Sequence, residues 1–292
     1  MKKTILLTAF LLLLSTSYAQ KVETDKKSLV LDGIVKMDQI EEREPLPYPP
    51  IHESDIFMTR RVWRVLDLRE RLNYPLYYPT QLVQSRKSFA QAVVAALQKG
   101  QIKAYDTDTD EFTSELSFTD VLTKFDAGDR KVSRRTLDDR DTTYTIKGEI
   151  NWGEVQELLI KEEWYFDKRQ SRHHVRILGI CLVRVYSKEL RTIEDEEVEG
   201  EMLKRQLFWI YYPDARKVLA NTPCYVGTND LSQVSFDDLF QNRRFSSYIS
   251  AMSNGQGNRR VLSYTRTGRD AMREAQRLED ELMNFESDLW EY

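Results

Sequence analysis

The strongest constraint on the fold is a pair of adjacent β-forming segments near the middle of the chain. Residues 162–168 (EEWYFDK) are separated by the four residues RQSR from a longer segment, 173–186 (HHVRILGICLVRVY). In the longer segment one set of alternate positions is apolar throughout, and the other set is apolar in the middle. This pattern is typical of a strand buried along one face and partly along the other. The short gap favours an antiparallel hairpin, so we expect an antiparallel sheet at the centre of the core.

Further hairpins and helices are predicted on both sides of this pair. Residues 206–212 and 216–220 flank a Pro213–Asp214 turn and predict a second hairpin. Helices are predicted at 85–100 (capped by Ser85, closed by Gly100), at 155–159, at 235–240 (opened by a Ser235/Asp238 capping box) and at 245–252, with short strands at 102–105 and 144–150. Together these elements predict an α+β fold, in which an antiparallel sheet of hairpins packs with helices.

The last segment of the chain predicts an amphipathic helix that starts near Thr267. Its apolar residues follow at spacings of 4, 3, 4, 3 and 4: Ala271, Ala275, Leu278, Leu282, Phe285 and Leu289. This is an a/d seam of nearly three heptads. Because three heptads is short for a coiled coil, we favour packing of the seam on the protein's own core over pairing with another chain.

The first residues have the pattern of an export signal. Lys2 and Lys3 precede an apolar run at 5–14, and Ser17 and Ala19 occupy the two small positions of a cleavage site. The apolar run is too short to span a bilayer, and no later stretch is apolar enough to do so. We therefore expect a leader at 1–19 and a mature protein in an extracytoplasmic compartment.

A proline-rich segment follows the leader. Four prolines fall within six residues, at 45, 47, 49 and 50, and hold the chain in an extended, polyproline-like form. Two interpretations remain open: a linker, or an arm that lies in a groove on a neighbouring molecule. The predicted organisation is a leader at 1–19, an extended arm at 20–58, an α+β core at 59–252, and a C-terminal linker and helix at 253–292.

Composition and cysteine content limit the class of function. Without Lys2 and Lys3, the 43 basic residues become 41 against 47 acidic ones, a net charge of −6. A mildly acidic chain of mixed charges has no electrostatic footprint for nucleic acid. Cys181 and Cys224 could pair in an oxidising compartment, but the position of Cys181 within an apolar strand favours a buried, inert thiol.

The search for catalytic chemistry gives no motif. The sequence has no G-x-S-x-G, no H-E-x-x-H and no phosphate-binding glycine loop. His173 and His174 are adjacent and so point to opposite faces of a strand, and His52 lies in the arm. We expect no catalytic residue, no cofactor and no metal, and a protein that works by binding other proteins.

One acidic segment has part of a calcium-loop pattern. Asp106, Asp108 and Asp110 have D-x-D-x-D spacing, but Glu111 stands where the turn glycine belongs and Ser117 replaces the bidentate glutamate. We favour a solvated turn. A small-ligand or calcium-binding module remains one alternative, and a periplasmic hydrolase with an unrecognised site is another.

Four segments together resemble the GldN/PorN family of gliding-motility and type IX secretion proteins of Bacteroidetes. They are RRVWRVLDLRERLNYPLYYP (60–79), LIKEEWYFDKRQSRHHVRILGI (159–180), LFWIYYPDARKVLA (207–220) and SFDDLFQNRRFSSYI (235–249). The leader, the proline-rich arm and the terminal helix extend the resemblance over nearly the whole chain. The region 106–143 and the region 188–204 fit less well in length and charge.

The resemblance implies a periplasmic, non-enzymatic component of the type IX secretion machine. It implies a ring of many copies, assembled with an outer-membrane lipoprotein of the GldK/PorK type, and contact with the periplasmic part of a GldM/PorM-type motor protein. It implies no cofactor. Extended geometry and aromatic side chains often dominate interfaces. On that basis the interface candidates are Pro45, Tyr48, Pro50, Trp63, Tyr77 and Tyr78, with core packing as the alternative for Trp63.

Overall fold

A computed structural model describes most of the chain after residue 42. The described residues are 43–81, 86–128, 130–135, 141–146, 148–187, 190–191, 197–198, 202–226, 234–255 and 257–290. The chain divides into two compact units, 1–38 and 39–292, and everything below concerns the second. The predicted leader and the part of the arm before residue 43 lie outside the described residues.

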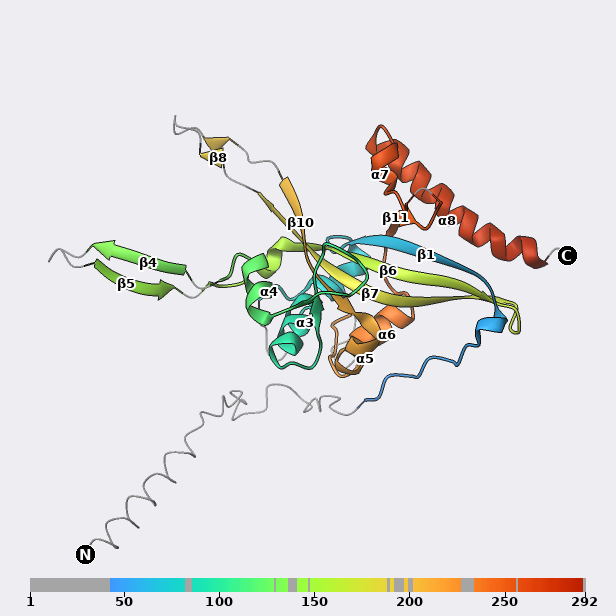
Figure 1. Ribbon diagram of the computed structural model, residues 1–292, viewed down its shortest axis with the longest axis horizontal. Coiled ribbons are helices and arrows are strands. Elements are labelled where there is room, and N and C mark those ends of the chain that lie inside the picture. Colours follow the sequence, from blue (N-terminus) through green and yellow to red (C-terminus); the bar gives the residue numbers. More distant parts are fainter. Residues whose placement is uncertain are drawn as a thin grey trace, which may run out of the picture. The chain divides into compact units, whose positions relative to one another are not determined.

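The centre of the second unit is a seven-stranded antiparallel sheet (Figure 1). Its strand order is β11-β1-β6-β7-β10-β2-β3. The strands are β1 (Ile56–Asp67), β2 (Ala104–Tyr105), β3 (Glu115–Leu116), β6 (Val155–Asp167), β7 (Arg172–Ser187), β10 (Met202–Tyr211) and β11 (Tyr248–Met252). Two short hairpins are separate from it, β4 (Arg130–Arg135) with β5 (Asp141–Ile146) and β8 (Leu190–Arg191) with β9 (Glu197–Val198). The α+β prediction is confirmed.

Helices complete the unit. They are α2 (Tyr74–Tyr77), α3 (Phe89–Gln98), α4 (Phe118–Lys124), α5 (Tyr212–Ala220), α6 (Phe236–Gln241), α7 (Val261–Tyr264) and α8 (Gly268–Trp290), with single 3-10 turns η1 (Glu53–Asp55), η2 (Arg71–Asn73) and η3 (Trp152–Glu154). β1 thus begins at Ile56, inside the segment expected to be arm.

The central hairpin is confirmed, but it is longer than predicted. β6 pairs with β7 from Val155 to Asp167, so the helix predicted at 155–159 is wrong. From Glu157 to Glu162 every side chain of β6 is buried. Burial on both faces hides the alternation that marks a strand, and the apolar residues that remain imitate helical spacing.

The second predicted hairpin is wrong in its second half. β10 pairs with β7 and is followed directly by α5, which starts at Tyr212 with proline in its first turn. Pro213 therefore opens a helix, which proline does as readily as it makes a turn. Tyr212, Ala215 and Leu219 recur at helical spacing on the buried side of α5.

Three other predicted elements differ in type or boundary. The helix predicted at 245–252 is wrong, because these residues lead into the edge strand β11, which pairs with β1 over Val62–Val65. The helix over 89–98 is confirmed, but its capping residue is Ser88, in a capping box with Gln91. Ser85, the predicted cap, lies outside the described residues. The Ser235/Asp238 capping box is confirmed at the start of α6.

Helices α3, α4, α5 and α6 supply the main core against one face of the sheet. Leu158 and Ile160 of β6 meet Phe89 of α3 and Phe240 of α6 there. Paired residues on neighbouring strands share a face. Since Val62 pairs with Glu162, and Arg64 with Ile160, these side chains continue the same face toward β11.

Helix α8 covers that continuation and lies beside β11 and β1 (Figure 1). Ala271, Leu278 and Leu282 of its seam pack with Val62, Trp164, Ile249, Met252 and Val261. The prediction that the seam packs on the protein's own core is confirmed for these positions. The side chains of Phe285 and Leu289 lie outside the described part of the chain.

Candidate interaction surfaces

Residues 43–50, the described part of the arm, lie extended on the protein's own body. The Arg43 guanidinium donates to both carboxylate oxygens of Asp238 in α6, at 2.6 and 3.0 Å. Its backbone N–H donates to Asn221 Oδ1 at 2.6 Å. At the other end, Arg176 of β7 donates to the carbonyl oxygen of Pro49 at 2.6 Å. The arm is therefore tied at both ends to α6 and β7.

Tyr48 sits between these ties, with an arginine on each side. The guanidinium carbons of Arg176 and Arg216 lie 4.8 and 4.4 Å from its ring centroid, within the range of cation–π attraction. Gln241 donates to its hydroxyl at 3.4 Å. Burial raises the pKa of the Tyr48 hydroxyl, against the smaller opposing effect of the Gln241 hydrogen bond.

The arginine beneath Tyr48 is itself held in place. Arg216 donates to both carboxylate oxygens of Asp237, at 3.0 and 3.2 Å, and the Tyr212 hydroxyl donates to the same carboxylate at 2.7 Å. Burial raises the pKa of Tyr212, and the negative charge of Asp237 raises it further. The arm is thus docked on a fixed platform of its own chain, although Leu46 remains 81% exposed. Among the arm candidates, Pro45 and Tyr48 are half-buried and Pro50 is exposed.

A second surface is a cluster of three tyrosines around α2. The ring of Tyr78 meets those of Tyr74 and Tyr77 edge-on, with centroids 5.4 and 4.8 Å apart. The Tyr77 hydroxyl donates to the carbonyl oxygen of Gly153 at 2.9 Å, while Tyr74 and Tyr78 are 43% and 48% exposed. We call Tyr74, Tyr77 and Tyr78 the tyrosine cluster. Its outer rings offer amphipathic area on a fixed base, as interface residues do.

The base of the tyrosine cluster is fixed by a buried asparagine. The Asn73 side-chain amide donates to the carbonyl oxygens of Asp67 and Ser246, at 2.7 and 2.9 Å, and its oxygen accepts from the Ser246 backbone N–H at 2.9 Å. These bonds join the end of β1 to the segment before β11. The tyrosine cluster therefore stands on the sheet rather than on a free loop.

Trp63, in contrast, is half-buried under the loop that carries the D-x-D-x-D pattern. Its indole N–H donates to Asp110 Oδ2 at 2.7 Å, and the buried Lys161 ammonium donates to the Asp110 carbonyl oxygen at 2.6 Å. Phe112 of the same loop covers Gly179, where an added Cβ would lie 2.5 Å from the ring. The packing alternative describes Trp63.

The same loop engages its carboxylates with lysines. Asp106 is paired with Lys124, whose hydrogen bond lowers the pKa of the Asp106 carboxyl, and Asp110 Oδ2 lies 3.1 Å from the Lys161 ammonium. Lysine thus neutralises two of the three carboxylates proposed as calcium ligands. Among the described residues, no group of three His, Cys, Asp or Glu side chains is arranged to hold a metal ion.

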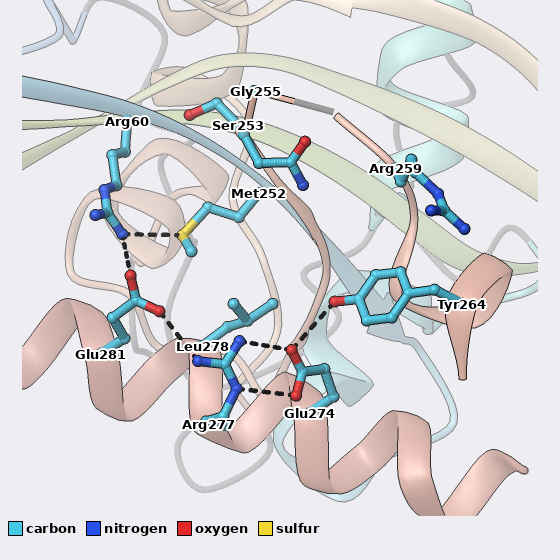
Figure 2. Close-up of a pocket in the computed structure, with 11 residues that line it drawn as sticks. Arg60, Met252, Ser253, Gly255, Arg259, Tyr264, Glu274, Arg277, Leu278 and Glu281 are labelled. Atoms are coloured by element: carbon cyan, nitrogen blue, oxygen red, sulfur yellow. Dashed lines mark hydrogen bonds and ion pairs between the residues drawn. The ribbon is translucent and has the colours of Figure 1, made fainter. Parts of the chain in front are cut away.

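A hollow of about 750 Å³ lies between β1, β11 and the α7–α8 pair (Figure 2). Arg60 pairs with Glu281 at 2.6 Å, and Arg277 pairs with Glu274 at 2.6 Å and with Glu281 at 3.3 Å. The Tyr264 hydroxyl donates to Glu274 at 3.3 Å. The Arg277 hydrogen bond lowers the pKa of Glu274. Both acids of the hollow are therefore engaged by arginine.

A buried charge network joins α8 to the sheet. Glu162 is fully buried and accepts from Arg243 at 2.8 Å and from the Trp164 indole at 3.0 Å, with Arg64 Nε 3.3 Å away. Arg64 also donates to Glu279 of α8 through both terminal nitrogens, at 3.1 Å each. The network links β1, β6, the segment before β11, and α8.

The cysteines and histidines take structural positions. Both cysteines are free and buried, so the disulfide alternative is wrong, and burial raises the thiol pKa of Cys181 to about 12 and that of Cys224 to about 11. His174 stacks on Tyr165, and His173 meets Phe166 edge-on.

Residues 51–291 match the family described as gliding motility associated protein GldN. The chain belongs to the GldN family. The resemblance inferred from the four segments is confirmed, and with it an association with gliding motility. The description of the family names a motility role and no reaction. A search of curated proteins gives no match. Among the described residues of this GldN-family chain, no helix is both long and apolar enough to cross a membrane.

The GldN match begins at Ile51, just after the docked arm. It includes the tyrosine cluster, the hollow and the buried charge network. Sequence reasoning did not find the last two, because Arg60 and Glu281, or Arg64 and Glu279, are more than 200 residues apart. The exposed Tyr74 was also missed, although its neighbours at 77 and 78 were named.

Proposed function

We propose that this chain is a non-enzymatic structural component of the type IX secretion and gliding-motility machinery. In this proposal it lies in the periplasm and forms a ring of many copies with an outer-membrane lipoprotein of the GldK/PorK type. It also contacts the periplasmic part of a GldM/PorM-type motor protein. The observation that carries the proposal is the GldN family match over residues 51–291.

The surfaces of the body support a role in assembly. A ring of identical copies needs heterologous contacts, in which one patch meets a different patch on the neighbour. The tyrosine cluster and the arm platform are two such patches, separate in sequence and different in chemistry. The acids that line the hollow are already paired with arginines, so they do not favour the hydrolase alternative.

The tyrosine cluster is our candidate for the contact with the lipoprotein. Tyrosine is enriched among interface residues that cost more than about 2 kcal/mol when truncated. Replacing both Tyr74 and Tyr78 by alanine should therefore weaken the complex by about thirtyfold or more. Both rings are about half exposed, so the melting temperature should change little.

The test is co-expression of the chain with the lipoprotein, followed by sizing of the purified product by light scattering. Tyr225→Ala is the matched control, because this tyrosine is similarly exposed, at 40%, and lies outside the cluster. A wild-type chain that stays monomeric beside the lipoprotein would overturn the ring proposal. A Tyr74→Ala/Tyr78→Ala chain that assembles like the control would remove the tyrosine cluster from the interface.

A further inference from the structure

The outer face of α8 carries a stripe of side chains that nothing in the described structure covers. It lies opposite the buried seam and consists of Arg269, Met272, Arg273, Gln276, Asp280 and Met283. These positions recur at intervals of three and four, so they form one continuous face. Met272 and Met283 are 76% and 59% exposed, unusually large values for apolar side chains on a helix whose other face is buried. We call these six residues the outer stripe.

The helix is strongly polarised in charge. The sequence from Arg259 to Arg277 contains six arginines and two acids, whereas the sequence from 278 to 292 contains six acids and no lysine or arginine. This order opposes the helix dipole, which favours acids at the start of a helix and bases at its end. The polarity therefore does not stabilise α8 itself, and a partner is needed to explain it.

Intramolecular pairing uses some of these charges and leaves others. Glu279 and Glu281 are engaged by Arg64 and Arg60 of β1, at 3.1 and 2.6 Å. On the outer stripe, Asp280 accepts only a hydrogen bond from Gln276, at 3.1 Å. No acid in the described part of the chain pairs with Arg269 or Arg273. The free charges are thus basic at one end of the outer stripe and acidic at the other.

We propose that the outer stripe pairs with the outer stripe of a second copy of this chain, with the two α8 helices antiparallel. Only this orientation places the basic half of each helix against the acidic half of the other, because a parallel pair sets like charges side by side. A pairing centred near Arg277 brings Arg273 of one copy close to Asp280 of the other. It also brings Met272 close to the second copy's Met283, so the exposed apolar area is covered in the same contact.

This pairing goes beyond the proposed ring. It is a two-fold contact in which the same patch is used on both copies, whereas a ring closes through two different patches. It requires neither the lipoprotein nor the motor protein. The pairing can therefore fail while the proposed function stands, and the reverse also holds.

The test measures the mass of the purified full chain alone by analytical ultracentrifugation over a range of concentrations. We expect reversible dimers at low salt that dissociate as salt is raised from about 0.05 M to about 0.5 M. Arg273→Glu alone and Asp280→Arg alone each turn two attractive pairs into repulsive ones. Each variant should raise the dissociation constant at least about tenfold.

The decisive sample is an equimolar mixture of the two variants. In a mixed antiparallel pair, the glutamate introduced at position 273 of one chain meets the arginine introduced at position 280 of the other. The unchanged Asp280 and Arg273 of the two chains also meet, so dimers should return to near the wild-type fraction.

Arg205→Glu, at another exposed arginine, is the control for net charge and should dimerise like wild type. A monomeric wild-type chain would overturn the proposal. So would variants that dimerise normally, or a mixture no more associated than its two components.

Discussion

The arm and helix α8 both attach to the same body, but by opposite means. The arm, residues 43–50, is held by ion pairs, hydrogen bonds and two cation–π contacts at side chains that remain partly exposed. Helix α8 is held by an apolar seam, with Leu278 and Leu282 at 6% and 2% exposure, and by the buried charge network around Glu162. One attachment is polar and open to water, and the other is apolar and dry.

This difference separates a detachable segment from an integral one. Exposed ion pairs stabilise by about 0–1 kcal/mol and cation–π contacts at such sites by about 0.5–1 kcal/mol each. Burial of a leucine stabilises by about 1.5–3 kcal/mol. The arm can therefore leave its platform without unfolding the body. Helix α8 is part of the core, so it presents its outer stripe in a fixed position.

The largest effect is expected where α8 meets the sheet. Glu162→Gln removes the negative charge between Arg64 and Arg243 while it keeps the shape of the side chain. Loss of one partner of a buried pair costs about 3–5 kcal/mol, because the remaining charge is buried without compensation. We expect this loss in the free energy of unfolding measured with urea.

Glu279→Gln is the control for this change. It removes the other carboxylate bound by Arg64, but this side chain is 39% exposed, so the cost should stay below about 1 kcal/mol. Equal costs for the two variants would show that the Glu162 site is no drier than the surface of α8.

A smaller effect is expected for the arm. Tyr48→Ala removes both cation–π contacts and the hydrogen bond from Gln241, so the arm should detach. The free energy of unfolding should fall by no more than about 1–2 kcal/mol, while limited proteolysis should cut within 43–50 much faster than in wild type. Leu46→Ala is the control on the same segment, because Leu46 is 81% exposed and its loss should leave the arm protected. Unchanged proteolysis of Tyr48→Ala would contradict the docked arm.

The smallest effect concerns the ion pair at the start of the arm. Burial alone would raise the pKa of Asp238, but hydrogen bonds from Ser235 and the charge of Arg43 outweigh it and hold this pKa below its usual value. A lowered pKa in the folded state stabilises above the unfolded pKa, about 3.9, and this contribution is lost as the pH falls through the lowered value. The contact of the arm should therefore be constant near pH 7 and weaken only below about pH 4.

Titration of the Asp238 carboxyl by NMR provides the measurement. In Arg43→Ala its pKa should rise relative to wild type, though not fully, because the Ser235 hydrogen bonds remain. An identical pKa in the two proteins would show that Arg43 does not hold the arm to α6.

Local patterns predicted the elements whose stability is local. The capping box at Ser235/Asp238, the α8 seam and the two strands joined by RQSR were recognised because their signals lie within a few residues. The errors fall where tertiary context decides. Phe245, Ile249 and Met252 have helical spacing, yet they lead into and form an edge strand that pairs with β1. Residues 216–220 are as apolar as a strand, but Pro213 sets the preceding turn in helical geometry.

The candidate surfaces were predictable only in part. The proline spacing predicted an extended arm and not its platform, because Arg43 meets Asp238 across 195 residues and Pro49 meets Arg176 across 127. The aromatic pair at Tyr77 and Tyr78 was visible in the sequence. The burial of Trp63 depends on a loop that folds back 47 residues later to accept its indole N–H.

The two thiols have a practical consequence for mapping any assembly of this protein. Both native cysteines are buried, with pKa values of about 12 and about 11, so almost no thiolate is present at neutral pH. A cysteine introduced at an exposed position, as in Met272→Cys or Tyr78→Cys, would be the reactive one. Site-directed cross-linking and fluorophore attachment can thus start from the natural sequence, without first removing Cys181 or Cys224.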